Sequence, residues 1–285
     1  MSKKLLRRIS INVLGYDLGV KVWSRMEIIG DIVVIKKPFN IGVDVLKPIA
    51  EEILKRLPYI KSVWCGVSEV KGQFRLREFI HLAGEPRSET IYKEHGCKFK
   101  VDIRRVYVSQ RLNAEHIRVA RLVREGEVVV NMFAGVGLFS IIIAKHSKAS
   151  KIYSIDINPY AYKLMVENVK INHVEDRVYP ILGDAKDVIT RELSNIADRV
   201  LMPLPELVHE YLKYAILSLR KNGYLHLYDF IGVPKGEDPI RRCIERFDLD
   251  FKSLNLKNYA YTNSRIVRSV GPRRYQIAVD VYIEK

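Results

Sequence analysis

An apolar run that breaks into a short glycine loop constrains the fold of this chain more than any other feature. The run Val128–Met132 leads into Ala134-Gly-Val-Gly137, and a helix-like apolar stretch follows directly. Glycines in such a loop let the backbone turn tightly and let a ligand approach amide groups at the positive end of the helix. About 20 residues after Gly135, a second apolar run ends in Asp156. This order predicts a doubly wound α/β fold that binds the ribose of an adenosine-containing cofactor.

The charge of the chain is distributed unevenly. Of 285 residues, 48 are Lys or Arg and 33 are Asp or Glu, which gives a formal net charge of +15. Residues 1–125 hold 25 of the basic and 14 of the acidic side chains, a net charge of +11, so the basicity lies ahead of the glycine loop. A basic module beside a nucleotide-cofactor module indicates a polyanionic substrate such as nucleic acid. A lysine-rich solvated surface, as in heat-adapted proteins, is the alternative.

Targeting and redox features favour the cytoplasm. The apolar runs are too short to cross a bilayer, and the cationic N-terminal residues lack the apolar core of a signal peptide. The cysteines at positions 65, 97 and 243 show no C-x-x-C spacing, so structural disulfides are not expected. His95 and Cys97 do not make a zinc site by themselves, and we expect no metal. We therefore expect a cytoplasmic protein with no membrane segment.

Strand and helix signals divide the chain. We expect a small basic α+β domain for RNA recognition in residues 1–105, a connecting helical segment in residues 106–125 and an α/β domain with a mixed, mostly parallel sheet in residues 126–285. In the first half, strands are predicted at Met26–Ile35 (broken at Gly30-Asp31), Ser62–Val70, Phe74–Leu82 and Cys97–Ile103, with helices at Val43–Leu57 and Leu112–Val123. In the second half, strands are predicted at Val128–Met132, Ile152–Ile155, Val178–Leu182, Val200–Leu201, Tyr224–Phe230, around Tyr259 and at Tyr275–Ile283, and helices at Leu138–Lys145, Ala161–Ile171, Pro205–Leu219 and Pro239–Phe247.

The loop fits a methyl-donor site better than a dinucleotide site. A dinucleotide fingerprint has the form G-x-G-x-x-G, and Ser140 stands where its third glycine would be. Gly183-Asp184, at the end of the third predicted strand, is typical of Rossmann-like class I S-adenosylmethionine-dependent methyltransferases, which hold adenine there. Asp156 would then bind the ribose hydroxyls, although an ordinary turn acid is the alternative for this residue. An NAD-dependent oxidoreductase is a weaker hypothesis.

Collinear motifs make the resemblance specific. The chain resembles the archaeal and eukaryotic family of tRNA (guanine-N1)-methyltransferases that modify position 37, beside the anticodon, together with its wyosine-pathway relatives. The resemblance covers roughly residues 25–285 in the family's order. Its matching stretches are Ile29–Ile32, Leu82–Glu85, Tyr92–Asp102, Val106–Glu115, Met132–Gly137, Ile155–Pro159, Glu167-Asn168 with Asn172, Pro180–Asp184 and Ala197–Met202.

The resemblance implies roles for individual residues. Guanine N1 carries a proton at neutral pH, so a base must remove it while another group stabilises the charge that develops on O6. The resemblance makes Glu115 the base and Arg75 the O6-stabilising cation, with Arg111 also catalytic. The alternatives are an i,i+4 helix salt bridge for Arg111 and Glu115, and a phosphate contact from a strand for Arg75. The residues implied to bind S-adenosylmethionine are Tyr107, whose alternative is a core aromatic, Phe133, Ala134, Gly135, Val136, Gly137, Asp156, Ile157, Gly183, Asp184 and Pro203.

Two departures from the family pattern keep alternatives open. Asn131 stands where the first strand usually ends in an acid. Pro203 stands where these N-methyltransferases have an asparagine that accepts a hydrogen bond from the target base, and proline has no side-chain acceptor. The main hypothesis is methylation of guanine N1 at position 37. The alternatives are a wyosine-pathway enzyme that methylates a carbon of the tricyclic base, less favourably one that transfers an aminocarboxypropyl group, and a non-catalytic RNA-binding protein with a vestigial cofactor fold.

The expected partner is tRNA, recognised at its anticodon stem-loop. The basic residues of the first half would supply the phosphate contacts. We expect the protein to act as a monomer.

Overall fold

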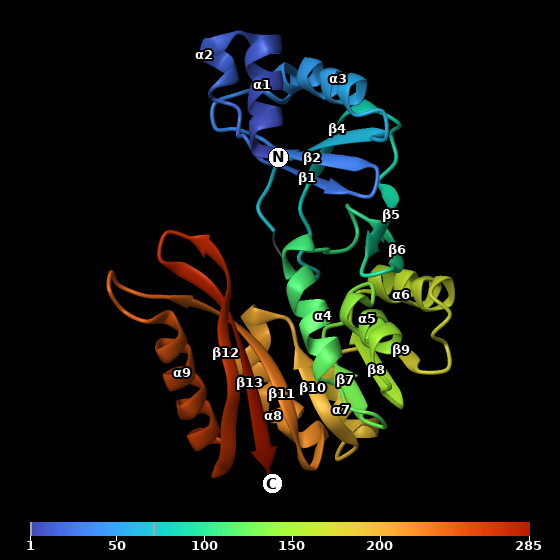
Figure 1. Cartoon of the computed structure of the whole chain (residues 1–285), viewed down its shortest axis with the longest axis vertical. Coiled ribbons are helices and arrows are strands. Elements are labelled where there is room, and N and C mark those ends of the chain that lie inside the picture. The colour runs from blue at the N-terminus through green and yellow to red at the C-terminus, as the bar shows by residue number, and fades with distance from the viewer. Residues whose placement is uncertain (1, 71) are drawn as a thin grey trace. The chain divides into compact units, whose positions relative to one another are not determined.

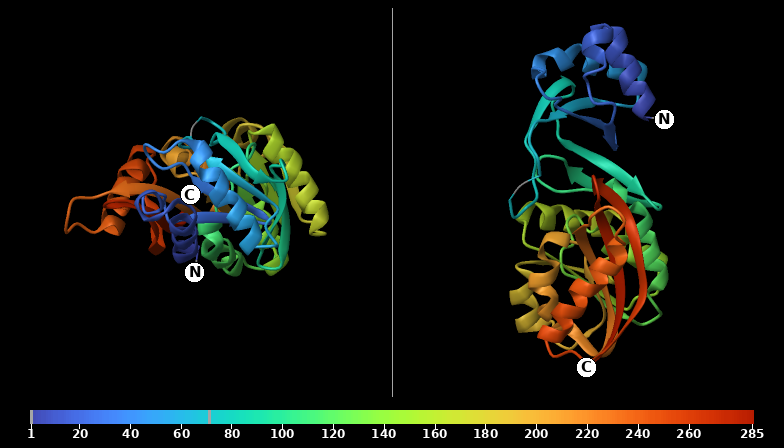
Figure 2. Two further views of the ribbon diagram at one scale, coloured as in Figure 1. Left: turned by 90° about the horizontal axis from the view of Figure 1, so that it is seen from above. Right: turned by 90° about the vertical axis from the view of Figure 1, so that its left-hand side faces the viewer.

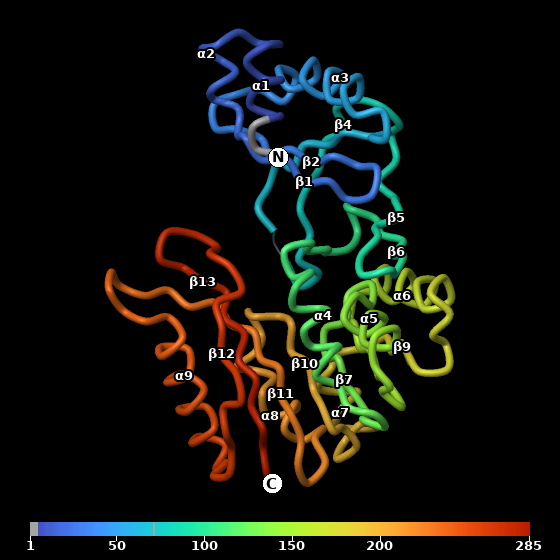
Figure 3. Tube along the Cα trace, in the orientation of Figure 1, coloured from blue at the N-terminus to red at the C-terminus, as the bar shows by residue number. Residues whose placement is uncertain are grey.

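The computed structural model describes residues 2–70 and 72–285, and this part of the chain divides into two compact units (Figure 1). The first unit contains the chain up to Glu94 together with Lys98–Val108. The second contains His95–Cys97 and Ser109–Lys285. Figure 3 traces the backbone of both. No helix in the described ranges is long and apolar enough to cross a membrane.

The first unit packs helices against a mixed sheet in the order β1-β2-β3-β4. A hairpin joins β1 to β2 at Gly30, where a Cβ atom would lie 2.6 Å from the carbonyl oxygen of Ile91, so that only glycine fits. The core contains Leu6, Ile9, Ile35 and Ile53. The elements are α1 (Ser2–Leu14), α2 (Tyr16–Gly19), β1 (Met26–Ile29), β2 (Ile32–Lys36), η1 (Val43–Leu46), α3 (Lys47–Arg56), β3 (Ser62–Gly66) and β4 (Phe79–Gly84), followed by the ribbon of β5 (Glu89–Glu94) and β6 (Cys97–Asp102).

The second unit is built on a sheet with the order β12-β13-β11-β10-β7-β8-β9. Strands β11, β10, β7, β8 and β9 run parallel, and β13 pairs antiparallel with both β11 and β12. Its strands are β7 (Val128–Asn131), β8 (Lys151–Asp156), β9 (Val178–Leu182), β10 (Ala197–Met202), β11 (Leu219–Gly232), β12 (Asn258–Gly271) and β13 (Arg274–Glu284). Its helices are η2 (Gln110–Leu112), α4 (Asn113–Leu122), α5 (Leu138–His146), α6 (Pro159–Ile171), α7 (Ala185–Glu192), η3 (Pro205–Leu207), α8 (Val208–Ser218) and α9 (Pro239–Ser253).

Helices cover both faces of this sheet (Figure 2). Leu225 and Leu227 of β11 belong to the apolar core that also contains Leu212 of α8 and Phe247 of α9. Side chains alternate along a strand, so the intervening residues of β11 face the opposite side, where α4 lies. The fold is therefore the predicted mixed, mostly parallel α/β sheet with an antiparallel edge.

Several local predictions were wrong. The helix α1 was not predicted. It buries Leu6 and Ile9 and lies in a stretch that had been considered only for its cationic residues. Strand β5 was missed because its buried face carries Thr90 and Glu94, which hide the apolar alternation. Helix α7 was missed because it is short and begins at a residue already assigned to the cofactor.

Several predicted boundaries also differ, and two of the differences have a local structural cause. The strand predicted to start at Phe74 starts at Phe79, since Arg75 lies in a turn after Gly72 and has a φ of +55°. Residues 221–223, predicted as a connection, belong to β11. A Cβ atom on Gly223 would lie 2.7 Å from the carbonyl oxygen of Asp198, which explains the glycine inside the strand.

A buried ion pair stabilises the base of the sheet. The Arg199 side chain, 2% exposed, donates from Nε and Nη2 to the Glu127 carboxylate at 2.8 and 3.0 Å. Its Nη2 also donates to the carbonyl oxygen of Leu122 at 2.9 Å, which connects the end of α4 to β10. Breaking such a pair on one side leaves an uncompensated buried charge.

We therefore expect Glu127→Gln to lower the free energy of unfolding of the second unit by about 3 kcal/mol. Urea unfolding followed by circular dichroism measures this. Glu125→Gln is the matched control, because its ion pair with Lys148 is about three-quarters exposed at both partners, and it should change stability by less than about 0.5 kcal/mol. Equal effects of the two variants would contradict the role assigned to the Arg199 pair.

His209 connects α8, β11 and α9 on the face of the sheet that α8 and α9 cover. His209 of α8 lies 3.0 Å from Asp229 of β11 through Nε2 and contacts Asp250 of α9 through Nδ1. Burial lowers the pKa of His209, but the two carboxylates outweigh it, so its pKa lies above the ordinary value.

A histidine pKa raised by folding stabilises the protein below its unfolded pKa, and this contribution is lost as the pH rises through the folded pKa. We expect His209→Gln to lower the free energy of unfolding more at about pH 5.5 than at about pH 9. Urea titrations at both pH values test this, with His173→Asn, an exposed turn residue, as the control. A pH-independent cost would contradict the assignment.

Candidate functional site

All the predicted cofactor residues except Tyr107, which lies in the first unit, lie at or just after strand ends on one edge of the sheet in the second unit. Phe133–Gly137 follow β7, Asp156 and Ile157 end and follow β8, Gly183-Asp184 follow β9, and Pro203 follows β10. These strands are parallel neighbours in the order β10-β7-β8-β9. The chain order reverses between β7 and β10, which makes this edge the topological switch point where open α/β sheets bind ligands.

The glycine loop owes its shape to residues that tolerate positive φ. Gly135 has a φ of +57° and Gly137 a φ of +92°. The N–H of Ala134 donates to the carbonyl oxygen of Ile155 at 2.8 Å, and the N–H of Gly137 to that of Ala134 at 2.9 Å. A Cβ atom on Gly137 would lie 3.1 Å from side-chain atoms of both Ile141 and Met165. Glycine is therefore required where α5 begins.

Asp156 holds the loop against β8. Its Oδ2 accepts the N–H of Gly135 at 2.6 Å, and its Oδ1 accepts the N–H of Asn158 at 2.9 Å. Burial raises the pKa of Asp156, while these two backbone donors favour its charged form. A partly buried carboxylate at the end of the second parallel strand is the group that binds ribose hydroxyls in this type of fold.

Two aromatic residues meet at the end of β9. Asp184 caps α7 by accepting the N–H of Lys186 at 3.0 Å. Tyr211 of α8 donates its hydroxyl to the same carboxylate, with both oxygens at 3.0 Å, and its ring contacts Phe133 with centroids 5.3 Å apart. Burial raises the pKa of Tyr211, so the hydroxyl stays protonated and remains a donor. Nothing in the sequence marks Tyr211 except its apolar position on a predicted helix.

Asn168 of α6 also contacts the glycine loop, a role that the sequence did not predict. Its Nδ2 donates to the carbonyl oxygen of Val136 at 3.0 Å and so fixes the loop from the helix side. It was quoted as part of a motif, but its contact could not be inferred from the motif alone.

Asn131 supplies a polar group beneath the loop. Its Nδ2 donates to Ser140 Oγ at 3.1 Å, which accounts for the serine found in place of a third glycine. Among the described residues its buried Oδ1 has no hydrogen-bond partner, and neither has Ser154 Oγ on the paired strand. Such orphaned buried acceptors call for a ligand or water. They lie on the two strands that end in the glycine loop and in Asp156.

Glu115 lies elsewhere in the second unit, in the first turn of α4, with 1% of its side chain exposed. Its Oε2 accepts from Arg118 at 3.0 and 2.8 Å and from the Tyr228 hydroxyl at 2.9 Å. Arg265 Nε lies 3.2 Å from Oε1. The residue considered as the i,i+4 partner of Arg111 is thus paired with Arg118, three positions further along the helix. Arg111 itself lies in η2, immediately before α4.

Arg75 and Tyr107 come together in the first unit. The Arg75 guanidinium lies over the Tyr107 ring, 4.5 Å from its centroid, a cation–π contact. Both line a hollow of about 60 Å³, whose other walls include Phe79 and Val106. The family resemblance gave Arg75 a role at the target nucleobase and Tyr107 a role at the cofactor. In the structure these two side chains form one pair.

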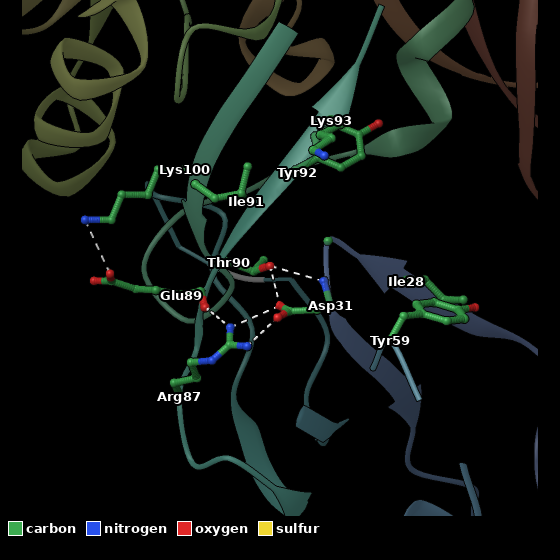
Figure 4. A pocket seen from close by; sticks show the side chains of 11 residues that line it. Ile28, Asp31, Tyr59, Arg87, Glu89, Thr90, Ile91, Tyr92, Lys93 and Lys100 are labelled. Carbon is green, nitrogen blue, oxygen red and sulfur yellow. Dashed lines mark hydrogen bonds and ion pairs between the residues drawn. The ribbon is translucent and has the colours of Figure 1, made fainter. Parts of the chain in front are cut away.

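A larger hollow in the first unit has a volume of about 820 Å³ (Figure 4). The polar side chains at its centre are hydrogen-bonded to one another. Arg87 donates to Asp31, and Thr90 Oγ1 donates to Asp31 Oδ1 at 2.6 Å. The pKa of Asp31 is lowered mainly by the hydrogen bond from Arg87. These side chains link the β1–β2 turn to β5, so we interpret them as structural.

Comparisons with known proteins show the family to which the chain belongs. A family model described as the TRM5/TYW2 methyltransferase domain matches residues 90–256. The tRNA 4-demethylwyosine(37)-methyltransferase Taw21 of Saccharolobus solfataricus is 44% identical over 91% of this chain and 94% of its own length. The tRNA (guanine(37)-N(1))-methyltransferase Trm5b of Pyrococcus abyssi is 40% identical over 90% of this chain and 74% of its own length.

Solved structures extend the similarity. The aTrm5 chain in its complex with tRNALeu matches with a TM-score of 0.84 and 35% identity, over 100% of this chain and 79% of that one. TYW2 of M. jannaschii in complex with AdoMet matches with a TM-score of 0.68 and 29% identity, over 92% of this chain and all of that one.

If Asp156 binds the ribose, as the sequence predicts, its removal should weaken cofactor binding. We expect Asp156→Ala to weaken binding of S-adenosylmethionine about tenfold or more, because it removes a ligand contact and releases the Gly135 N–H. Calorimetry measures the affinity. Asp176→Ala is the control, since that carboxylate is 72% exposed and pairs with Arg177 alone among the described contacts. Unchanged affinity in Asp156→Ala would remove this residue from the site.

Proposed function

Because the chain belongs to the TRM5/TYW2 methyltransferase family, we propose that it transfers a methyl group from S-adenosylmethionine to the modified purine at position 37 of tRNA, beside the anticodon. The observation that carries this proposal is the 44% identity to Taw21 over nearly the full length of both chains. We further propose that it acts in the cytoplasm as a monomer, without a metal ion.

The strand ends of the second unit would hold the cofactor. Asp156 would bind its ribose, Asp184 with the Tyr211 hydroxyl its adenine edge, and the loop Ala134–Gly137 would lie against the rest of the cofactor, with Asn131 Oδ1 as a further acceptor. Phe133 and Ile157 would pack against the adenine. When bound, the cofactor supplies a methyl group on a sulfonium sulfur, which keeps the electron pair of the broken bond.

Glu115 would take the proton that the acceptor loses. Both guanine N1 and an unsubstituted ring carbon of the tricyclic base carry one hydrogen, which must leave as the methyl group arrives. A buried carboxylate held by Arg118 and Tyr228 can receive that proton at Oε1. Arg75, fixed over Tyr107, would stabilise the negative charge on the exocyclic oxygen, and Arg111 would hold the RNA beside α4.

Pro203 favours the tricyclic acceptor over guanine N1. It follows β10, where a side-chain acceptor for a guanine edge would be expected, and it offers none. The proline leaves an apolar surface suited to the wider, less polar tricyclic base. We therefore propose that 4-demethylwyosine at position 37 is the preferred substrate, in line with the identity to Taw21. Guanine N1 methylation is the second candidate, favoured by the similarity to Trm5b and aTrm5.

Mass spectrometry of the position-37 nucleoside tests the proposal. Protein and S-adenosylmethionine are incubated with tRNA that carries either guanine or 4-demethylwyosine at position 37. We expect one methyl group on the tricyclic base and a slower reaction, or none, on guanine. Methylation of guanine alone would favour the second candidate, and transfer of an aminocarboxypropyl group or no transfer at all would contradict the proposal.

The same assay tests Glu115. We expect Glu115→Gln to lower the single-turnover rate by about 10²- to 10⁴-fold, the usual contribution of a general base, while calorimetry finds cofactor affinity nearly unchanged. A rate close to that of the unmodified protein would exclude Glu115 as the proton acceptor.

A further inference from the structure

The two oxygens of Glu115 have different surroundings. Oε2 accepts hydrogen bonds from Arg118 and from Tyr228, a tyrosine that is fully buried. Burial raises the pKa of Tyr228 well above its ordinary value, so its hydroxyl is protonated and donates at neutral pH. Oε2 is therefore fixed in position, and any proton that Glu115 accepts from a substrate must go to Oε1.

The groups that hold Oε2 are themselves anchored across the sheet. Arg118 also donates to Asp280 of β13 at 2.5 and 3.2 Å, and Asn263 Nδ2 of β12 donates to the same carboxylate at 3.2 Å. Asp280 lies 2.6 Å from His226 Nδ1 of β11, and His226 Nε2 lies 2.7 Å from Arg199 Nη1. Arginine can only donate, so His226 Nε2 accepts and its Nδ1–H donates to Asp280.

This arrangement makes His226 neutral. Burial lowers the pKa of His226, and the guanidinium groups of Arg199 and Arg118 act in the same direction against the Asp280 carboxylate. The buried network thus has fixed charges: carboxylates at Glu115, Asp280 and Glu127, and guanidinium groups at Arg118 and Arg199.

Among the described contacts of this network, carboxylates outnumber buried guanidinium groups by one. Arg265 of β12 supplies the remaining positive charge, with its Nε 3.2 Å from Glu115 Oε1. Within the described chain Oε1 is buried without a hydrogen-bond partner, so this contact is an ion pair and not a hydrogen bond. Arg265 is also 41% exposed, whereas the Arg118 side chain is 15% and that of Arg199 2% exposed.

These differences separate two kinds of cation. Arg118 is mostly buried and Arg199 fully buried, and each makes several hydrogen bonds, so moving either of them would leave charges unpaired in the core. The Arg265 side chain is partly exposed, so it can turn into solvent and lose, among the described contacts, only its ion pair with Glu115 Oε1. If it leaves, Oε1 loses the one cation that contacts it among the described residues.

We propose that Arg265 is an exchangeable counter-ion of Glu115, which neutralises Oε1 until the target base of the RNA displaces it and presents its own proton there. This inference rests on the proposed function, in which Glu115 accepts that proton. Tyr228 and Arg118 are positioning residues, because they hold Oε2 while Oε1 changes its partner.

This exchange accounts for the proton that the target base loses. The bond between the ring atom of the base and its hydrogen breaks, and its electron pair remains on the ring atom to form the bond to the methyl carbon. The proton goes to Oε1, so that Glu115 becomes a neutral carboxyl group as Arg265 leaves. An RNA phosphate is the natural new partner for the displaced guanidinium.

Carbon-13 NMR of protein labelled at the glutamate δ-carbon tests the exchange directly, with the Glu115 signal identified by its loss in Glu115→Gln. S-adenosylhomocysteine and tRNA bearing the preferred base are added so that no transfer occurs. We expect tRNA to shift the Glu115 signal toward the position that it has in RNA-free Arg265→Gln. A Glu115 signal that does not respond to saturating tRNA would overturn the proposal.

Arg268→Gln is the matched control. Arg268 lies on the same strand and carries the same charge, but its Nε donates to Gln276 at 2.7 Å. We expect this variant to leave the RNA-free Glu115 signal in place and to show the normal shift with tRNA. If Arg268→Gln moves the RNA-free signal as Arg265→Gln does, the effect is one of general charge and the proposal fails.

Single-turnover rates separate this inference from the proposed function. If the Glu115 signal responds to tRNA but Glu115→Gln turns over normally, the exchange stands and the base assignment fails. If Glu115→Gln is inactive but tRNA leaves the signal unchanged, the base assignment stands and the exchange fails. Tyr228→Phe should lower the rate at saturating tRNA several-fold without weakening tRNA binding, as expected of a residue that acts through Glu115.

Discussion

The candidate catalytic carboxylate depends on one buried guanidinium. Arg118 of α4 bridges Glu115 on its own helix to Asp280 on β13, and Asp280 is in turn held by His226 and, through it, by Arg199. A helix that precedes the first parallel strand is thereby fixed to strands at the far end of the same sheet. Because each member of this network is buried and paired, the position of Glu115 is set by the fold and not by the flexibility of its side chain.

The cofactor site follows from a separate constraint, the geometry of parallel strands. Carboxyl ends of parallel strands meet at one edge, so the loop after β7, Asp156 after β8 and Asp184 after β9 become neighbours although about fifty residues separate the first from the last. Backbone N–H groups, Asn168 and the Tyr211 hydroxyl then fix each of these groups. The site is therefore preorganised by hydrogen bonds that the protein makes to itself.

The sequence predicted what depends on local pattern and missed what depends on long-range pairing. The glycine loop, Asp156 and Asp184 are marked by their places after apolar runs, and the sheet edge follows from topology. Tyr228, Asp280 and Arg265 could not be assigned, because their meeting with Glu115 joins residues more than a hundred positions apart. Strand β5 was missed because its buried Thr90 and Glu94 carry no apolar signal: Thr90 donates to Asp31 of the β1–β2 turn, and Glu94 accepts from the Tyr92 hydroxyl on the same strand.

The central claim is that Glu115 Oε1 receives the proton of the position-37 base. A structure of the protein bound to S-adenosylhomocysteine and tRNA tests it most directly. We predict the reacting ring atom of the target base within hydrogen-bond distance of Glu115 Oε1, with Tyr228 and Arg118 still on Oε2 and Arg265 turned away. A target base bound at the edge formed by β7, β8 and β10 while Arg265 still covers Glu115 would contradict the account.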